Sequence, residues 1–125
     1  MREIYGYLLD PIGSIYEPRK LQDDIHTYYR ELHCDLIDIT VIQIAGKRYQ
    51  VICDDEGLLR ENPLPTIYRP DGTLVGACFI TGLADCEGNL TSLTDDDVAN
   101  IARHLVTRPD LKKLYGIEAL LFAFG

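Results

Sequence analysis

The residue types best suited to acid–base chemistry are gathered in Asp54-Asp55-Glu56-Gly57, directly after the apolar run Val51-Ile52-Cys53. Adjacent carboxylates of this kind can bind a cation or move a proton. An EF-hand calcium loop, however, has acids at alternating positions before its glycine and a glutamate six positions after it. Here the acids are contiguous, and Pro63 stands where that glutamate belongs. The pattern favours a strand that ends in an acidic turn, with Gly57 taking a positive φ.

Cysteine and histidine side chains form the second set of candidates for chemistry. Zinc sites usually take these residues as close pairs that bracket a turn. The chain has no such spacing among its cysteines and histidines, which are Cys34, Cys53, Cys78 and Cys86 with His26, His33 and His104. We therefore predict no metal site and no cofactor.

Nucleophilic catalysis needs a serine or cysteine beside a base, and a third group that orients the base. The sequence contains no nucleophile elbow, no phosphate-binding glycine loop and no dinucleotide fingerprint. Cys53 and Cys78 lie in apolar runs typical of buried, unreactive thiols. The sequence therefore leans against an enzyme. The candidate catalytic residues that it leaves open are the carboxylates Asp54, Asp55 and Glu56 together with His33.

Composition and charge bound the class of protein. The chain has 125 residues, 46% of them hydrophobic and 26% charged, which predicts a single compact soluble domain. A net charge of −8 argues against binding to a nucleic-acid backbone, but it leaves open an acidic decoy that imitates nucleic acid. The sequence has no signal-peptide pattern and no apolar run long enough to span a membrane. These features predict a reduced, cytoplasmic protein.

Local patterns in the first half predict a strand, a helix and a hairpin. The strand is Ile4–Leu9, ended by a turn at Asp10–Gly13. Apolar residues at helical spacing predict a helix over residues 18–32, begun by Pro18. The hairpin comprises Leu36–Ile44, the turn Ala45–Arg48 and Tyr49–Cys53. The apolar phase flips inside its first strand, which predicts either a bulge near Val41–Ile42 or burial of both faces.

The second half begins with a proline-rich stretch, residues 60–72, which predicts an irregular segment. Leu74–Ile80 is apolar at odd and even positions alike, which predicts a central strand. Thr94 followed by three aspartates predicts a capped helix start. Pro109 predicts a second short helix that stops at Gly116. The apolar tail Ile117–Gly125 is a last strand, a segment packed into the core or a patch for a partner.

These elements predict an α+β fold in the order β-α-β-β-β-α-α. A mostly antiparallel sheet of four or five strands would be packed on one face by the helix at residues 18–32, and the C-terminal helices would complete the core. We expect one domain over residues 1–125, with a body at about residues 4–105. The C-terminal segment 106–125 would follow this body, and its apolar tail could join two copies in a homodimer.

Several short motifs occur in a particular order along the chain. They are Tyr7 to Gly13 (Tyr-x-x-x-Asp-Pro-x-Gly), Cys34 to Asp38, Ile52 to Leu59, Asn62 to Pro65 (Asn-Pro-Leu-Pro), Leu74 to Gly76 (Leu-Val-Gly) and Thr91 to Asp96. In this order the chain resembles the bacterial and phage family called domain of unknown function 3846. The asparagine-glutamate-glutamate-glycine step usual in that family is replaced here by Asp54-Asp55-Glu56-Gly57. The resemblance implies an accessory role on a phage or mobile element, and it supplies no catalytic residue.

The leading functional hypothesis is therefore a non-enzymatic accessory or protein-interaction module. Its partners would be proteins, including a second copy of the chain, rather than a nucleic-acid backbone or a membrane. Two alternatives belong to other classes. One is a small enzyme with an acidic site near Asp54–Glu56, and the other is an acidic inhibitor that imitates DNA.

Overall fold

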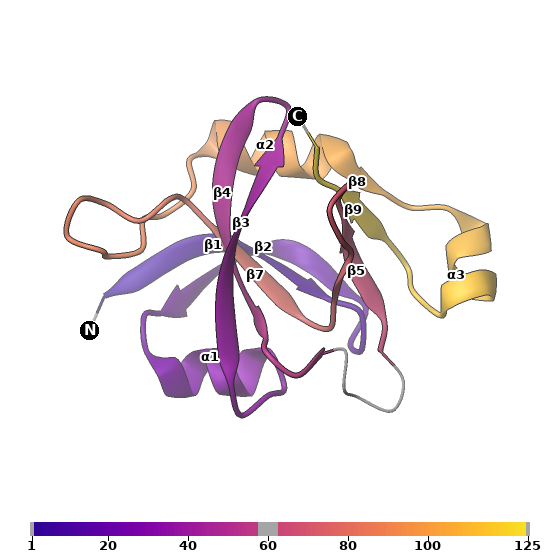
Figure 1. Ribbon diagram of the computed structural model, residues 1–125, viewed down its shortest axis with the longest axis horizontal. Coiled ribbons are helices and arrows are strands. Elements are labelled where there is room, and N and C mark those ends of the chain that lie inside the picture. Colours follow the sequence, from indigo (N-terminus) through magenta and orange to yellow (C-terminus); the bar gives the residue numbers. More distant parts are fainter. Residues whose placement is uncertain (1, 58–62, 125) are drawn as a thin grey trace.

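The computed structural model describes residues 2–57 and 63–124. Leu58, Leu59 and Asn62, which belong to two of the motifs, lie outside the described residues. The described chain forms two β-sheets and three α-helices (Figure 1). The predicted α+β class is confirmed.

The first sheet has five strands, all antiparallel, in the spatial order β2-β1-β7-β4-β3. They are β1 (Glu3–Asp10), β2 (Ile15–Gln22), β3 (Ile37–Ile44), β4 (Lys47–Asp54) and β7 (Cys78–Thr81). All four residues of β7 are buried. This central position explains why its sequence is apolar on both faces.

The second sheet has four short strands in the order β6-β5-β9-β8. They are β5 (Pro65–Tyr68), β6 (Leu74–Val75), β8 (Leu105–Val106) and β9 (Leu120–Phe122). Strand β9 pairs in parallel with β5 and antiparallel with β8. Of the three roles predicted for the apolar tail, it takes that of a last strand, and its Leu121 is completely buried.

The helices are α1 (Ile25–Glu31), α2 (Asp95–His104) and α3 (Pro109–Tyr115). Helix α1 covers one face of the first sheet (Figure 1), where Tyr28 and Leu32 pack with Ile4, Leu8 and Phe79. The second sheet and α2 cover the opposite face. That second core contains Tyr7, Leu9, Tyr49, Val51, Ile67, Ile80, Ile101 and Leu121.

The helix ends follow the predicted local signals. Thr94 and Asp97 form a capping box, in which the Thr94 Oγ1 accepts from the Asp97 N–H at 3.2 Å and the Asp97 carboxylate accepts from the Thr94 N–H at 2.9 Å. Pro109 begins α3, and Gly116 ends it with a left-handed φ of 74°. These three predictions are confirmed.

The predicted helix over residues 18–32 is wrong in its first half. Residues 15–22 form β2, which pairs with β1 from Ile15 opposite Asp10 to Gln22 opposite Glu3. Only Ile25–Glu31 is helical. Pro18 is compatible with β2 because this strand lies at the edge of the sheet, where a missing N–H breaks no ladder.

The bulge predicted near Val41–Ile42 is also wrong. The register between β3 and β4 runs unbroken to a two-residue turn, Ala45-Gly46, in which both residues have positive φ (51° and 85°). The alternative, burial of both faces, differs from the structure too. Ile42 and Ile44 are buried, whereas Ile39 and Val41 on the other face are 47% and 43% exposed.

Two further boundaries differ from the prediction. Leu74–Ile80 is not one strand, because Gly76 turns the chain with a φ of 81° and sends β6 and β7 into different sheets. The stretch 60–72 is not wholly irregular, because it contains β5. Pro65 is the first residue of that strand, a position that tolerates proline.

Candidate functional site

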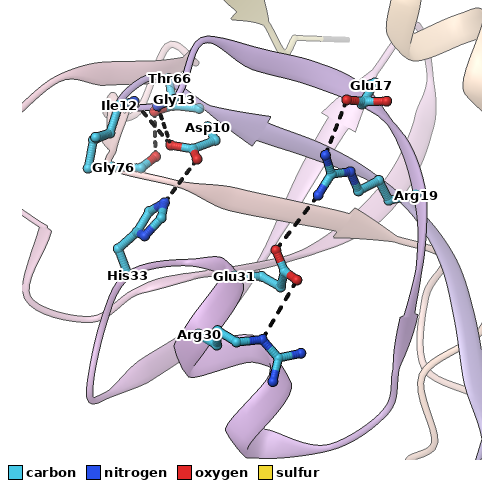
Figure 2. Close-up of polar contacts among 10 residues, drawn as sticks. All are labelled: Asp10, Ile12, Gly13, Glu17, Arg19, Arg30, Glu31, His33, Thr66 and Gly76. Carbon is cyan, nitrogen blue, oxygen red and sulfur yellow. Dashed lines mark hydrogen bonds and ion pairs between the residues drawn. The ribbon is translucent and has the colours of Figure 1, made fainter.

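A buried carboxylate at the end of β1 anchors the candidate site. Asp10 is only 3% exposed. Its Oδ1 accepts hydrogen bonds from the N–H groups of Ile12 (3.0 Å) and Gly13 (3.2 Å), so the turn after the strand holds the carboxylate in place. Its Oδ2 lies 2.9 Å from the Nε2 of His33 (Figure 2). The structure thus forms an Asp10–His33 dyad across 23 residues of sequence.

The backbone of His33 is held in a conformation that glycine normally takes. His33 follows α1 with a φ of 55°, and the next N–H, that of Cys34, donates to the Tyr29 carbonyl at 3.0 Å to close the helix. A left-handed residue with a side chain costs about 1–2 kcal/mol. Strain of this kind is concentrated at functional sites. Here it directs the imidazole toward Asp10 (Figure 2).

The dyad fixes which ring nitrogen of His33 is available. A carboxylate only accepts hydrogen bonds, so the proton of the neutral ring is assigned to Nε2, which donates to Asp10. The other nitrogen, Nδ1, is then an acceptor, and no hydrogen bond within the described part of the chain uses it. The His33 side chain is 48% exposed, so a ligand can reach it.

His33 borders a pocket of about 180 Å³, here called the His33 pocket. Its walls come from the turn after β1, the end of α1, the end of β4, the approach to β5 and the link between β6 and β7. The lining residues are mostly apolar or glycine; they are Ile12, Leu32, His33, Asp54, Gly57, Pro63, Leu64, Gly76 and Ala77. Segments far apart in the sequence therefore build one concave surface.

Of the three acids in the turn after β4, only Asp54 lines this pocket. The Asp54 Oδ1 accepts from the Glu56 N–H at 3.0 Å, and the Asp55 N–H donates to the Leu36 carbonyl at 3.0 Å. Asp55 lines a different pocket, beside Asp38 and Cys53, and Glu56 lines neither. Of the four candidate catalytic residues, the structure brings together His33 and Asp54 but not Asp55 or Glu56.

The role predicted for Gly57 is wrong. Gly57 does not have a positive φ; a Cβ at this position would lie 2.8 Å from the Val75 carbonyl oxygen, so glycine is required by close approach of two backbones. The positive φ in the pocket wall belongs to Gly76. Gly76 is fixed by its N–H to the Leu64 carbonyl (2.9 Å) and by the Thr66 hydroxyl, which donates to its carbonyl (Figure 2).

Asp10 is the site residue that the sequence reasoning missed. The motif Asp10-Pro11-Ile12-Gly13 predicts a turn, and the Asp10 side chain does stabilise that turn. The same carboxylate also orients His33. No local signal distinguishes an aspartate that only closes a turn from one that also holds a histidine.

A chain of ion pairs connects β2 with the helix that precedes His33 (Figure 2). Arg19 lies 3.3 Å from Glu17 and 3.8 Å from Glu31, and Glu31 lies 3.9 Å from Arg30. Solvent-exposed pairs contribute about 0–1 kcal/mol each. Their effect here is to restrain α1 against the sheet rather than to stabilise the fold strongly.

The remaining histidines lie elsewhere. The His26 ring packs edge-on against Tyr29, and the His104 Nδ1 contacts the Asn100 carbonyl in its own helix at 2.8 Å. Within residues 2–57 and 63–124, no three histidine, cysteine or acidic side chains are grouped as a metal ion would require. No helix in these ranges is long and apolar enough to cross a membrane.

We expect only one of the four cysteines to react in the folded protein. Burial raises the pKa of the Cys53 thiol to about 11 and holds that of Cys78 well above its ordinary value. Cys34 is also buried, whereas Cys86 is exposed. Ellman's reagent at pH 8 should label about one thiol per native chain and four after unfolding. Rapid native labelling of a Cys86→Ser variant would contradict this assignment.

Comparison with known proteins places the chain in a family. The family described as domain of unknown function (DUF3846) matches residues 2–106. The chain belongs to this family, which confirms the resemblance inferred from its motifs. No curated protein and no solved structure matches the chain.

Proposed function

We propose that this protein is a non-enzymatic interaction module, a cytoplasmic accessory protein of a phage or mobile element, and that its His33 pocket receives a basic side chain of a partner protein. One observation carries the proposal. Five of the motif segments that carry the family resemblance border or adjoin the His33 pocket, although they are spread from residue 7 to residue 76. The sheet order brings these separated segments to one hollow, where a single side chain of a partner could contact several of them at once.

The chemistry of the pocket favours a cationic group. Among the described lining residues, the side chains offer an acceptor in the Nδ1 of His33 and a negative charge in the carboxylate of Asp54, and they offer no donor when His33 is neutral. The apolar walls suit the alkyl stem of lysine or arginine, which packs along apolar surface. The net charge of −8 draws such a partner toward the protein. The free thiols of the described residues agree with a reducing compartment.

The Asp10–His33 dyad favours a second candidate, a hydrolytic or proton-transferring enzyme. A buried aspartate that orients a histidine is how many enzymes hold a general base. Among the residues that the structure describes, no serine, threonine, cysteine, lysine or tyrosine lines the His33 pocket, so a dyad served by these residues would act on water or directly on a substrate. Binding needs no such additional group, and we place it first.

The proposal predicts selective binding of a small cation to the His33 pocket. In an NMR titration, n-butylguanidinium should cause saturable shifts at His33, Leu32 and Ala77, whereas the uncharged analogue n-butylurea should not. A His33→Gly variant should weaken binding about tenfold or more, as expected for a lost hydrogen bond to a charged group. Glycine suits the φ of 55°, so this variant keeps the fold.

The matched control is His26→Ala, which removes an exposed histidine from α1, the helix that precedes His33. Capture from host extract should recover a partner with the wild type and with His26→Ala, but not with His33→Gly. Recovery of the same proteins with all three would overturn the proposal. Equal shifts with n-butylurea would show that the pocket selects ligands by shape and not by charge. Catalytic turnover by the wild type that is lost in His33→Gly would establish the enzyme instead.

A further inference from the structure

The outer edge of β3 carries backbone groups without partners. The Asp55 N–H donates to the Leu36 carbonyl, and bonding alternates along an antiparallel pair, so even-numbered residues of β3 direct their backbone groups toward β4. Ile39, Val41 and Gln43 therefore direct their N–H and C=O groups away from the sheet. No other segment of the described chain pairs with these groups.

This edge lacks the features that normally prevent pairing with another strand, which are proline, charge and bulges. Strand β2, at the other edge of the same sheet, contains Pro18 among the charged residues 17–20. Strand β3 has Asp38 as its one charged residue, an unbroken register, and half-exposed Ile39 and Val41 at its centre. The edge is therefore open to an added strand.

A groove of about 330 Å³, here called the arginine groove, lies beside the last part of this edge. Its walls come from β3, from the start of β4, from the segment after β5 and from the segment after β9. The lining residues are Val41, Ile42, Gln43, Arg48, Arg69, Pro70, Asp71, Ala123 and Phe124. It shares no lining residue with the His33 pocket.

The two arginines make this groove positive in a chain whose net charge is −8. The Arg48 side chain makes no hydrogen bond or ion pair within the described ranges. Arg69 is oriented by its Nε, which donates to the Gly72 carbonyl at 3.0 Å and lies 3.7 Å from the Asp71 carboxylate. The Asp71 side chain is 80% exposed, and an exposed pair contributes little. Two guanidinium groups against one such carboxylate favour an anionic ligand.

The pairing edge ends inside the arginine groove. The Phe124 carbonyl accepts from the Ala45 N–H at 3.2 Å and so uses the next outward donor after Gln43. A strand added beside β3 must stop at this point. A parallel strand brings its C-terminal end here and with it a carboxylate, whereas an antiparallel strand brings its N-terminal end and a positive ammonium group. The two arginines therefore select the parallel direction.

We propose that β3 binds the C-terminus of a partner protein as an added parallel strand, with its terminal carboxylate held by Arg48 and Arg69. The β3 wall offers N–H donors and C=O acceptors in alternation, which an extended peptide uses and an isolated anion cannot. Exposed Ile39, Val41 and Phe124 favour apolar side chains on the peptide. The net charge of −8 disfavours further acids in it.

The terminal carboxylate is tested with an N-acetylated pentapeptide of alternating valine and threonine. In an NMR titration, the free acid should cause saturable shifts at Val41 and Gln43. The C-terminal amide should bind at least tenfold more weakly, as expected for lost hydrogen bonds to a charged group. Arg48→Gln, at an exposed residue without contacts in the described chain, should weaken binding of the acid by a similar factor and bring acid and amide closer together.

The matched control is Arg103→Gln, which removes an exposed arginine from α2, outside the groove. It should bind the acid as the wild type does. Equal affinities of the wild type for acid and amide, or equal losses in Arg48→Gln and Arg103→Gln, would overturn the proposal. So would the absence of saturable shifts with the acid at millimolar concentration.

Strand addition is tested with two N-methylated forms of the acid peptide. Alternate residues of an added strand direct their N–H groups toward β3, and the others direct theirs to solvent. Methylation of the first set should weaken binding at least tenfold, whereas methylation of the second set should leave it unchanged. Equal affinities of the two forms would show a carboxylate site without strand pairing and would reject the inference.

The direction of the strand is tested with a nitroxide label at the N-terminus of the acid peptide. A parallel strand places this label toward the beginning of β3, so the Ile37 amide should broaden more than the Ala45 amide. Stronger broadening at Ala45 would show an antiparallel strand and would contradict capture of the C-terminal carboxylate by the arginines.

Discussion

An Asp97→Ala variant is expected to lose about 3 kcal/mol of unfolding free energy. Asp97 is 5% exposed, and its carboxylate accepts from Lys47, from the Tyr49 hydroxyl at 3.1 Å and from the Thr94 N–H at 2.9 Å. Hydrogen bonds to a charged group contribute about 1.5–3 kcal/mol each, and an N-cap about 1 kcal/mol. These contributions are not additive, and Lys47 remains solvated, so the loss stays below their sum.

The control for this prediction is Asp96→Ala. Asp96 lies in the same first turn of α2 and is exposed, so its removal should cost only the helix-dipole contribution, about 0.3–1 kcal/mol. Urea unfolding of the two variants measures the difference. Equal losses would mean that Asp97 acts only through the dipole and that its contacts with β4 contribute nothing.

The same carboxylate predicts a pH dependence. Burial raises the pKa of Asp97, but the hydrogen bonds from Lys47, Thr94 and Tyr49 outweigh burial, so the pKa lies below its ordinary value of 3.8. A carboxylate whose pKa is lowered by folding contributes its full stabilisation above its unfolded-state pKa. That contribution is lost as the pH falls through its folded-state pKa. The stability gap between wild type and Asp97→Asn should therefore be constant near pH 7 and shrink below about pH 4.

The second large effect is expected for Gly6→Ala, in the middle of β1. A Cβ on Gly6 would lie 2.5 Å from the Phe79 Cζ and 2.6 Å from the Ile80 carbonyl oxygen, both in the neighbouring central strand. The ring of Phe79 is completely buried and has no free space to move into. Overpacking of this kind costs about 1–3 kcal/mol, and a clash with backbone places this variant at the upper end.

Two variants isolate the steric cause. Gly88→Ala puts a methyl group into open space at a φ of 82°, so it should show only the backbone cost of about 1–2 kcal/mol. Adding Phe79→Leu to Gly6→Ala should relieve part of the clash, so the double variant should lose less than the sum of the two single variants. Strict additivity in thermal unfolding would reject the contact with the ring as the cause.

The parts of the fold that sequence predicted well depend on short-range interactions. Thr94, Pro109 and Gly116 act on amides and dihedral angles within a few residues of themselves, so their effects can be deduced locally. Strand β2 could not be deduced in this way. Its stability comes from eight pairs with β1, whereas the spacing of Leu21, Ile25, Tyr28 and Leu32 imitates a helix. The bulge predicted in β3 was wrong for a related reason. The apolar residues of this strand change phase because one of its faces is left uncovered in the fold.

The site was predicted only in part, because residue types are visible in the sequence whereas contacts between distant elements are not. The residue types of His33 and Asp54 suit acid–base chemistry, and the structure places both at one pocket. The two residues lie at one pocket only because the end of α1 is close to the end of β4. That proximity follows from the order of strands in the sheet, which the sequence does not reveal. Asp10 was missed because its contact with His33 spans two separate elements. The strain at His33 is likewise invisible in the sequence.

The parallel pairing of β5 with β9 has a consequence for the order in which the protein is made. All strands of the first sheet have been synthesised by Thr81, but the second sheet has its inner strand at Leu120–Phe122. Until β9 emerges from the ribosome, Ile67 lacks its neighbouring strand, and the face of the first sheet that packs against the second sheet is incompletely covered. Folding of the nascent chain should therefore pause with one core closed and the other open, a state in which exposed apolar surface invites chaperones or misassociation.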